Sequence, residues 1–121
     1  MMVESLNYSN LTLSSTKDTI AAFPARIHGF ELVSINTDDV FIVFYDALAA
    51  DVTVGSTTPD SWLFLPASDG TNRTGKDGYL HFAEKFTKGI VVAAIKAAAG
   101  VSGPSGSTAP TTSVAVLVRY S

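Results

Sequence analysis

Cysteine is absent from this chain of 121 residues, and histidine is nearly so, with only His28 and His81. Without cysteine, disulfide bonds, thiolate zinc sites and thiol nucleophiles are excluded. Two imidazoles, each in a strand-like run, give little material for a hydrolytic triad or a histidine-based metal site. The sequence therefore predicts a protein that is not an enzyme, has no cofactor and depends on a packed core for its stability.

Charge is also scarce. Charged residues make up 16% of the chain, against roughly 25% in typical soluble domains, while 46% of the residues are hydrophobic. The eight lysines and arginines are spread from Lys17 to Arg119 and the net charge is −3, so no basic patch is available to a nucleic-acid backbone. We expect no nucleic-acid partner. The apolar excess favours burial between copies of the chain or against a larger partner.

Long hydrophobic runs are missing as well. The longest apolar stretch, residues 89–101, is interrupted by Lys96 and is shorter than the roughly 20 residues of a membrane-spanning helix. The first 15 residues have no positive n-region and no continuous apolar h-region, so no secretory signal is predicted. We expect a protein that is made and kept inside a cell and does not enter a membrane.

What the sequence does contain is a series of strand-like runs separated by turn residues. Strands are predicted at residues 23–36, with a bulge at Gly29, and at 40–46, 52–54, 61–65, 79–86, 90–99 and 114–120. The runs at 79–86 and 89–97 are predicted to form a hairpin. Residues 1–22 are either an extended arm or a first strand, and residues 23–121 form one domain. The predicted fold is all-β, an antiparallel β-sandwich or jelly roll of roughly seven or eight strands.

The segment 39–66 is the most informative part of the pattern. Its first strand is apolar on both faces, with Phe41, Val43 and Tyr45 on one side and Val40, Ile42 and Phe44 on the other. Such a strand is either central to a two-layer core or covered by a second subunit.

Two loop motifs fail on inspection. The segment 70–76 has the spacing of a phosphate-binding P-loop, but Asp77 stands where Ser or Thr is needed, and a strand-like run follows in place of a helix. Read from Asp69 as a calcium loop, the same stretch places Thr71 and Arg73 at ligand positions. Neither a nucleotide nor a calcium site is predicted.

Four aspartates lie close together in the sequence, and we interpret them as turn caps: Asp38, Asp39, Asp46 and Asp51. The alternative is a divalent ion shared between neighbouring subunits, which would make assembly sensitive to chelators. Four aromatic residues offer a sugar-stacking platform as an alternative to core packing: Tyr45, Trp62, Phe64 and Tyr79.

Four segments, in this order, resemble small virion proteins of tailed bacteriophages: GFEL at 29–32, VFYD at 43–46, TVGSTTP at 53–59 and FTKGIVVA at 86–93. In that group a strand ending in an FYD-like tripeptide precedes a T-x-G-x-x-x-P turn, and an F-x-x-G strand follows. The resemblance covers residues 26–97 and departs in the long loop 67–78 and in the N-terminal segment.

The resemblance implies a capsid cement or decoration protein that stabilises the shell, commonly as a trimer, with the major capsid protein as its partner. It would be made in the host cytoplasm and located on the virion surface. The alternatives are a tail or neck component and a glycan-binding module of a head or tail fibre.

We expect the assembly contacts in residues 1–16, 51–60 and 67–78 and at Trp62. The candidate contact residues are Leu6, Tyr8, Leu11, Leu13, Val54, Trp62, Asn72 and Arg73. Deletion of residues 1–16 is expected to leave the fold intact.

Overall fold

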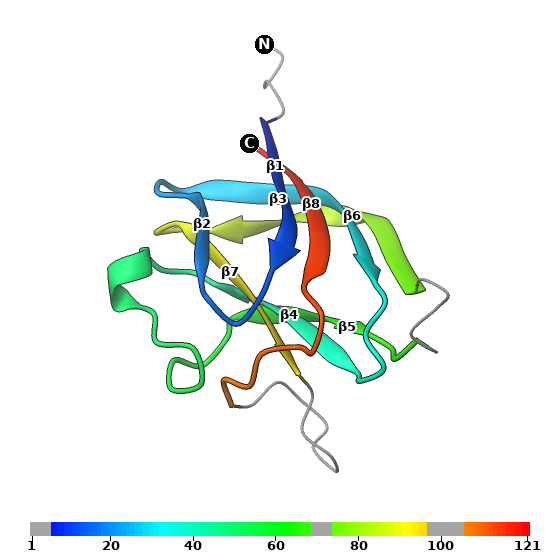
Figure 1. Cartoon of the computed structure of the whole chain (residues 1–121). Helices are drawn as coiled ribbons and strands as arrows, with labels where there is room; N and C mark the ends of the chain where they lie inside the picture. The colour runs from blue at the N-terminus through cyan, green and yellow to red at the C-terminus, as the bar shows by residue number, and fades with distance from the viewer. Residues whose placement is uncertain (1–5, 69–73, 97–105) are drawn as a thin grey trace.

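Two four-stranded antiparallel sheets pack face to face in the computed structural model, which describes residues 6–68, 74–96 and 106–121 (Figure 1). The first sheet has the order β1-β8-β3-β6, built from β1 (Leu6–Leu13), β8 (Val114–Tyr120), β3 (Ala25–Ser34) and β6 (Thr74–Phe86). The second has the order β2-β7-β4-β5, built from β2 (Asp18–Ala21), β7 (Ile90–Lys96), β4 (Val40–Tyr45) and β5 (Ser61–Leu65). The predicted β-sandwich is confirmed.

The alternation in the sequence sets which side chains enter the core. Along β3, the residues Ile27, Phe30 and Leu32 are buried, whereas Arg26 and Glu31 are exposed. The pairing of β3 with both neighbours shifts between Ile27 and Gly29, which confirms the predicted bulge. Because the bulge at His28 and Gly29 adds one residue to the strand, the apolar side chains that follow it point to the inner face again.

The alanine-rich run at 90–99 is a strand over its described part, as predicted. β7 lies between β2 and β4 in the second sheet, and Ile90–Ile95 are all buried. Small alanines fit this position because both faces of the strand are covered.

Three sequence-based expectations were wrong. β6 and β7 do not form a hairpin, because β6 pairs with β3 in the first sheet while β7 pairs with β2 and β4 in the second. Residues 52–54 are not a strand but follow the short 3-10 helix η1 (Ala49–Asp51) into a turn. β6 begins at Thr74, so the predicted loop 67–78 is shorter than expected.

Of the two alternatives predicted for the N-terminus, the structure has the first strand. Residues 6–13 form β1 of the first sheet and pair with β8, with a register shift between Asn10 and Leu13. Leu13 is 1% exposed and belongs to the core between the sheets. Deletion of residues 1–16 would remove an edge strand and a core side chain, so on this structure we expect the deletion to destabilise the fold.

Strand β4 has no exposed face, as its sequence predicts. Val40, Ile42 and Phe44 point into the core between the two sheets. Phe41, Val43 and Tyr45 point away from that core and form a second apolar cluster with β7 and with Val52. The second face is covered by the chain itself, so it gives no support for burial by another subunit.

Candidate functional site

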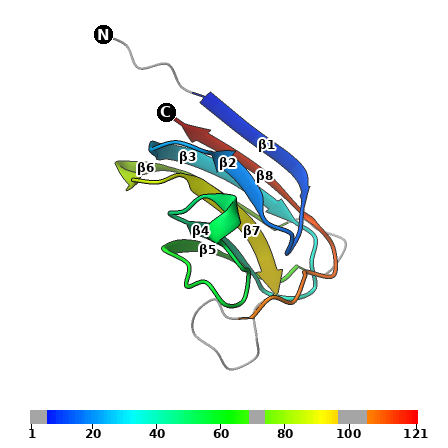
Figure 2. The ribbon, with the colours of Figure 1, turned by 90° about the vertical axis from the view of Figure 1, so that its left-hand side faces the viewer.

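The cover over the outer face of the second sheet is residues 47–59, which we call the covering segment. It connects β4 to β5 and contains η1. Val52 is fully buried against β4 and β7, with Ala47, Ala49 and Val54 packed beside it. Figure 2 shows this segment, with the short helix, lying outside strands β4 and β7.

A lysine from a distant part of the chain fastens the covering segment. The Lys17 ammonium donates hydrogen bonds to the carbonyl oxygens of Ala49, at 2.6 Å, and Val52, at 2.5 Å. Ala49 is the first residue of η1, and its carbonyl also accepts a hydrogen bond from the amide of Val52, the residue that follows η1. Lys17 thus joins the loop before β2 to the cover over β4.

The end of the covering segment is a tight turn. The Thr53 carbonyl accepts hydrogen bonds from the amides of Ser56 and Thr57, and the Thr53 amide donates to the Thr57 side-chain oxygen. Gly55 in this turn has φ +94°, and a Cβ there would lie 2.9 Å from the Cβ of Ser107. Glycine is therefore required both by the backbone conformation and by the close approach of the segment before β8.

Between this turn and the segment before β8 lies a pocket of about 190 Å³. Its lining consists of Tyr45, Gly55, Ser56, Thr57, Thr58, Pro59, Ile95 and Gly106. No lining residue carries a charge, and every polar side chain among them is a hydroxyl.

Tyr45 is the buried polar group of the pocket. The residue is 1% exposed, and burial raises the pKa of its hydroxyl above the ordinary value. Within the described part of the chain, no hydrogen-bond partner reaches this hydroxyl. No fully buried polar side-chain atom in that part of the chain lacks a partner, so the hydroxyl retains contact with solvent through the pocket.

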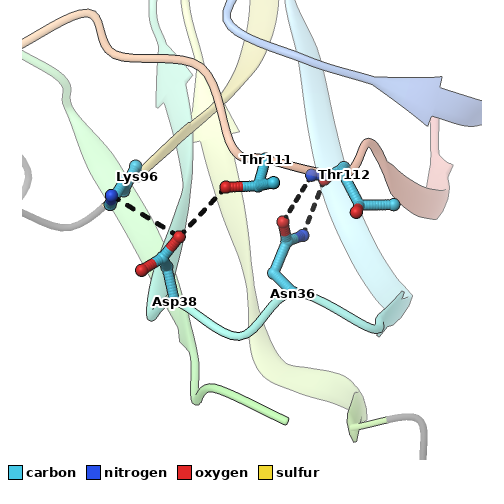
Figure 3. Close-up of polar contacts among 5 residues, drawn as sticks. All are labelled: Asn36, Asp38, Lys96, Thr111 and Thr112. Carbon is cyan, nitrogen blue, oxygen red and sulfur yellow. Dashed lines mark hydrogen bonds and ion pairs between the residues drawn. The ribbon is translucent and has the colours of Figure 1, made fainter. Parts of the chain in front are cut away.

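The opposite wall of the pocket is held by a polar network (Figure 3). The buried Asn36 side chain exchanges two hydrogen bonds of 2.7 Å with the backbone of Thr112. Asp38 accepts a hydrogen bond from the Thr111 hydroxyl and forms an ion pair with Lys96 at 3.5 Å. These contacts join the β3–β4 turn to β7 and to the residues before β8, so Gly106 approaches the pocket on an anchored segment.

The predicted contact residues lie in different environments. Leu6, Leu11 and Trp62 are exposed, with Leu11 at 72% and Trp62 at 47%. Tyr8 is partly buried, packs against the core and donates a hydrogen bond to Asp18, and its pKa is raised first by burial and then by that bond. Asn72 and Arg73 lie outside the described residues.

Leu13 is in the core, because the chain turns inward there to cross to the second sheet, so its side chain is not positioned for a surface contact. Val54 belongs to the covering segment and is partly buried against the second apolar cluster.

Two of the four aspartates interpreted as turn caps, Asp46 and Asp39, accept hydrogen bonds from backbone amides, whereas Asp38 bonds to the Thr111 hydroxyl and to Lys96. The Asp46 carboxylate accepts hydrogen bonds from the amides of Thr87 and Lys88 and from the Thr87 hydroxyl. Asp39 accepts one from the Ala67 amide. In residues 6–68, 74–96 and 106–121, no group of three or more acidic or histidine side chains is arranged to hold a metal ion.

The remaining candidate catalytic and binding residues have structural roles or lie outside the described residues. His28 shares a hydrogen bond of 2.5 Å with the hydroxyl of Ser121, which ties β3 to the end of β8. The His81 side chain is outside the described residues. The P-loop-like segment runs into strand β6 at Thr74 and not into a helix. In the described part of the chain, no helix has the length and apolar character needed to cross a membrane.

Sequence reasoning missed Lys17 and the pocket. Lys17 lies 32 residues from Ala49, and an isolated lysine in a polar loop carries no signal of such a contact. The turn residues Gly55 and Pro59 were recognised, but their position over Tyr45 depends on the covering segment folding back. Comparison of the chain with protein-family models, with curated proteins and with solved structures finds no match.

Proposed function

We propose that this protein is a structural assembly component, specifically a cement protein that attaches to the outer surface of a capsid and stabilises the shell. The observation that carries the proposal is a pair of uncharged edge strands, β1 and β5, each with large apolar side chains exposed. The resemblance of residues 26–97 to phage virion proteins supplies the kind of particle.

Both edge strands lack the charges and prolines that commonly protect a sheet edge from pairing with another chain. β1 has the sequence LNYSNLTL and β5 has SWLFL, with no charge or proline in either. β1 has a register shift between Asn10 and Leu13, so its regular edge is the part from Leu6 to Asn10. The other two edges differ, since β2 carries Asp18 and β6 contains four charged residues, Lys76, Asp77, Glu84 and Lys85.

Large apolar side chains are exposed on these two edges. Leu6 and Leu11 are exposed on β1, and Trp62 and Phe64 on β5, where Phe64 packs against Phe41 with ring centroids 5.4 Å apart. Exposed aromatic and leucine side chains are the usual anchors of protein interfaces.

The two edges lie on opposite sides of the sandwich. β1 stacks beside β2, as the Tyr8–Asp18 hydrogen bond shows, and β5 is at the other end of the second sheet, next to β6. Contact between β1 of one copy and β5 of the next is heterologous, and a heterologous contact forms a ring when the rotation between copies closes and an open filament when it does not. A trimer is the ring that the resemblance favours.

The size of the particles in solution tests the assembly step. We expect light scattering of the purified chain to show a mass that rises with concentration to that of a closed ring. Leu11→Glu and Trp62→Glu should each lower it to the monomer, because each places a charge in an apolar contact. Ala50→Glu, at an exposed position of η1, is the matched control. A monomeric wild-type chain at all concentrations would contradict the ring.

Electron microscopy of purified particles tests the location. Density for this chain at symmetry axes of the capsid surface is the expected result. A tail or neck component shares the same edges, so density confined to the tail or neck would replace the cement role with that one.

A further inference from the structure

The pocket beside Tyr45 is separate from the two apolar edges and has features of a ligand site. It combines a concave surface, a buried hydroxyl with no partner among the described residues, and walls held in place from both sides. Thr53 fixes one wall through the turn hydrogen bonds, and Asn36 anchors the other through Thr112. Walls that are ordered before binding reduce the entropic cost of taking up a ligand.

The polar groups of the pocket define the chemistry of its ligand. Tyr45, Ser56, Thr57 and Thr58 all present hydroxyls, which both donate and accept hydrogen bonds. The Thr57 oxygen already accepts from the Thr53 amide, so its hydrogen remains available to donate. A charged ligand would lose hydration without meeting an opposite charge, so the lining selects a neutral one.

The apolar lining groups and the volume of the pocket restrict the class of ligand further. Pro59 and Ile95 offer C–H surface beside the hydroxyls. A volume of about 190 Å³ is below the roughly 300–1,000 Å³ of pockets for drug-sized ligands, so the pocket holds one small ring or chain. Saccharide rings and polyols have this combination of many hydroxyls, no charge and C–H faces.

We propose that this pocket binds a neutral, hydroxyl-rich small molecule of the saccharide or polyol class, with the Tyr45 hydroxyl as its buried hydrogen-bonding anchor. The ligand supplies the Tyr45 hydroxyl with a hydrogen-bond partner that the described part of the chain does not provide. The same chemistry is offered by a free sugar and by the terminal ring of a glycan.

Trp62 provides a direct readout because it is the only tryptophan. It pairs with Val43 across β4 and β5, and Tyr45 follows Val43 on the same face, so the two aromatic side chains are diagonal neighbours. Titration with glucose, galactose, mannose, N-acetylglucosamine and glycerol should give, for at least one probe, a saturable change in tryptophan fluorescence. Amide NMR shifts should concentrate at residues 55–58, 95 and 106.

Variants assign the effect to the pocket. Tyr45→Phe and Thr58→Val each remove one hydroxyl with little change of shape, and each should weaken binding about three- to tenfold, the usual effect of one hydrogen bond. Tyr120→Phe removes a tyrosine hydroxyl from the other sheet and should leave the affinity unchanged. Leu11→Glu, on the β1 edge of the other sheet, should also bind as wild type, which separates this site from that assembly edge.

The outcomes distinguish the proposal from its failure. An oligosaccharide that binds more tightly than its free terminal sugar identifies a glycan as the source, and equal affinity identifies a free sugar or polyol. Absence of saturation with every neutral probe would overturn the proposal. So would unchanged binding by Tyr45→Phe, equal losses in Tyr120→Phe, or equal affinity for inorganic phosphate or N-acetylneuraminate.

Discussion

Asn36 is the polar residue on which one end of the sandwich depends. It is 1% exposed and bonds to both the amide and the carbonyl of Thr112 and to the Ser34 hydroxyl. Replacement by alanine would remove these three hydrogen bonds. Each such bond contributes about 0.5–1.5 kcal/mol net, so we expect Asn36→Ala to lower the free energy of unfolding by about 2–4 kcal/mol.

Urea denaturation measures this loss. Asn7→Ala, on the exposed side of β1, is the matched control and should change stability by less than about 0.5 kcal/mol. Similar losses in the two variants would show that the Asn36 contacts contribute nothing specific.

Asp46 makes the stability of the β6–β7 turn dependent on pH. Desolvation raises the pKa of its carboxyl, but the hydrogen bonds from Thr87, Lys88 and Gly89 outweigh it and hold the pKa below the ordinary value of 3.8. A lowered folded-state pKa gives stability that is fully present above the unfolded-state pKa and is lost as the pH falls through the folded-state value. We expect Asp46→Ala to destabilise the protein at pH 7 by about 1–2 kcal/mol.

The pH profile is the decisive measurement. The difference in urea midpoint between wild type and Asp46→Ala should be constant from pH 7 to about pH 5 and should shrink below pH 4. Asp51→Ala, at an exposed carboxylate, should show little difference at any pH. A gap that persists unchanged to pH 2.5 would rule out the carboxylate as its origin.

At the scale of the element, two leucines of β1 have different roles, since one stabilises the core and the other lies on the surface. Leu13 is 1% exposed and Leu11 is 72% exposed. We expect Leu13→Ala to cost about 2–5 kcal/mol because it leaves a cavity in the core. Leu11→Ala should cost less than about 0.5 kcal/mol, since its side chain is already in solvent. Thermal unfolding of both variants checks this, and equal costs would mean that β1 is not docked as described.

The covering segment is the second element whose stability can be isolated. Lys17→Met keeps the apolar stem of the side chain and removes the ammonium that bonds to Ala49 and Val52. We expect amide hydrogen exchange in residues 51–57 to accelerate while exchange in β4 and β7 changes less. Lys88→Met, at an exposed position, is the control. Uniform acceleration across both sheets would indicate global destabilisation in place of local opening.

These elements also show which structural features can be predicted from the sequence and which cannot. The alternation in β3 and the apolar faces of β4 follow directly from the period of a strand, and both were predicted. The sheet to which a strand belongs is set by contacts far along the chain, which is why β6 and β7 were misread as a hairpin. The covering segment packs over Tyr45 through contacts of Lys17 and Gly55. The partners of these two residues cannot be predicted from the residues next to them in the sequence. The pocket was therefore not predictable.

At the scale of the molecule, the covered and the exposed apolar surfaces lie in different places on the sandwich. The outer face of β4 and β7 is covered by the chain itself, and the edge strands β1 and β5 expose large apolar side chains on opposite sides of the molecule. The apolar excess in the composition is thus placed partly in the second cluster under the covering segment and partly on exposed positions, which include these two edges. The two edges are the surfaces on which we place assembly.

Mixing two defective variants tests whether those edges meet each other. Leu11→Glu spoils the β1 edge and keeps β5, whereas Trp62→Glu spoils β5 and keeps β1. If β1 of one copy contacts β5 of the next, each variant alone is monomeric, and the mixture forms a dimer that goes no further because only one intact contact is available. Light scattering of each variant and of the equimolar mixture measures this. If β5 instead pairs with β5 about a twofold axis, Leu11→Glu alone forms the dimer and the mixture adds nothing, which would replace the ring with a symmetric pair.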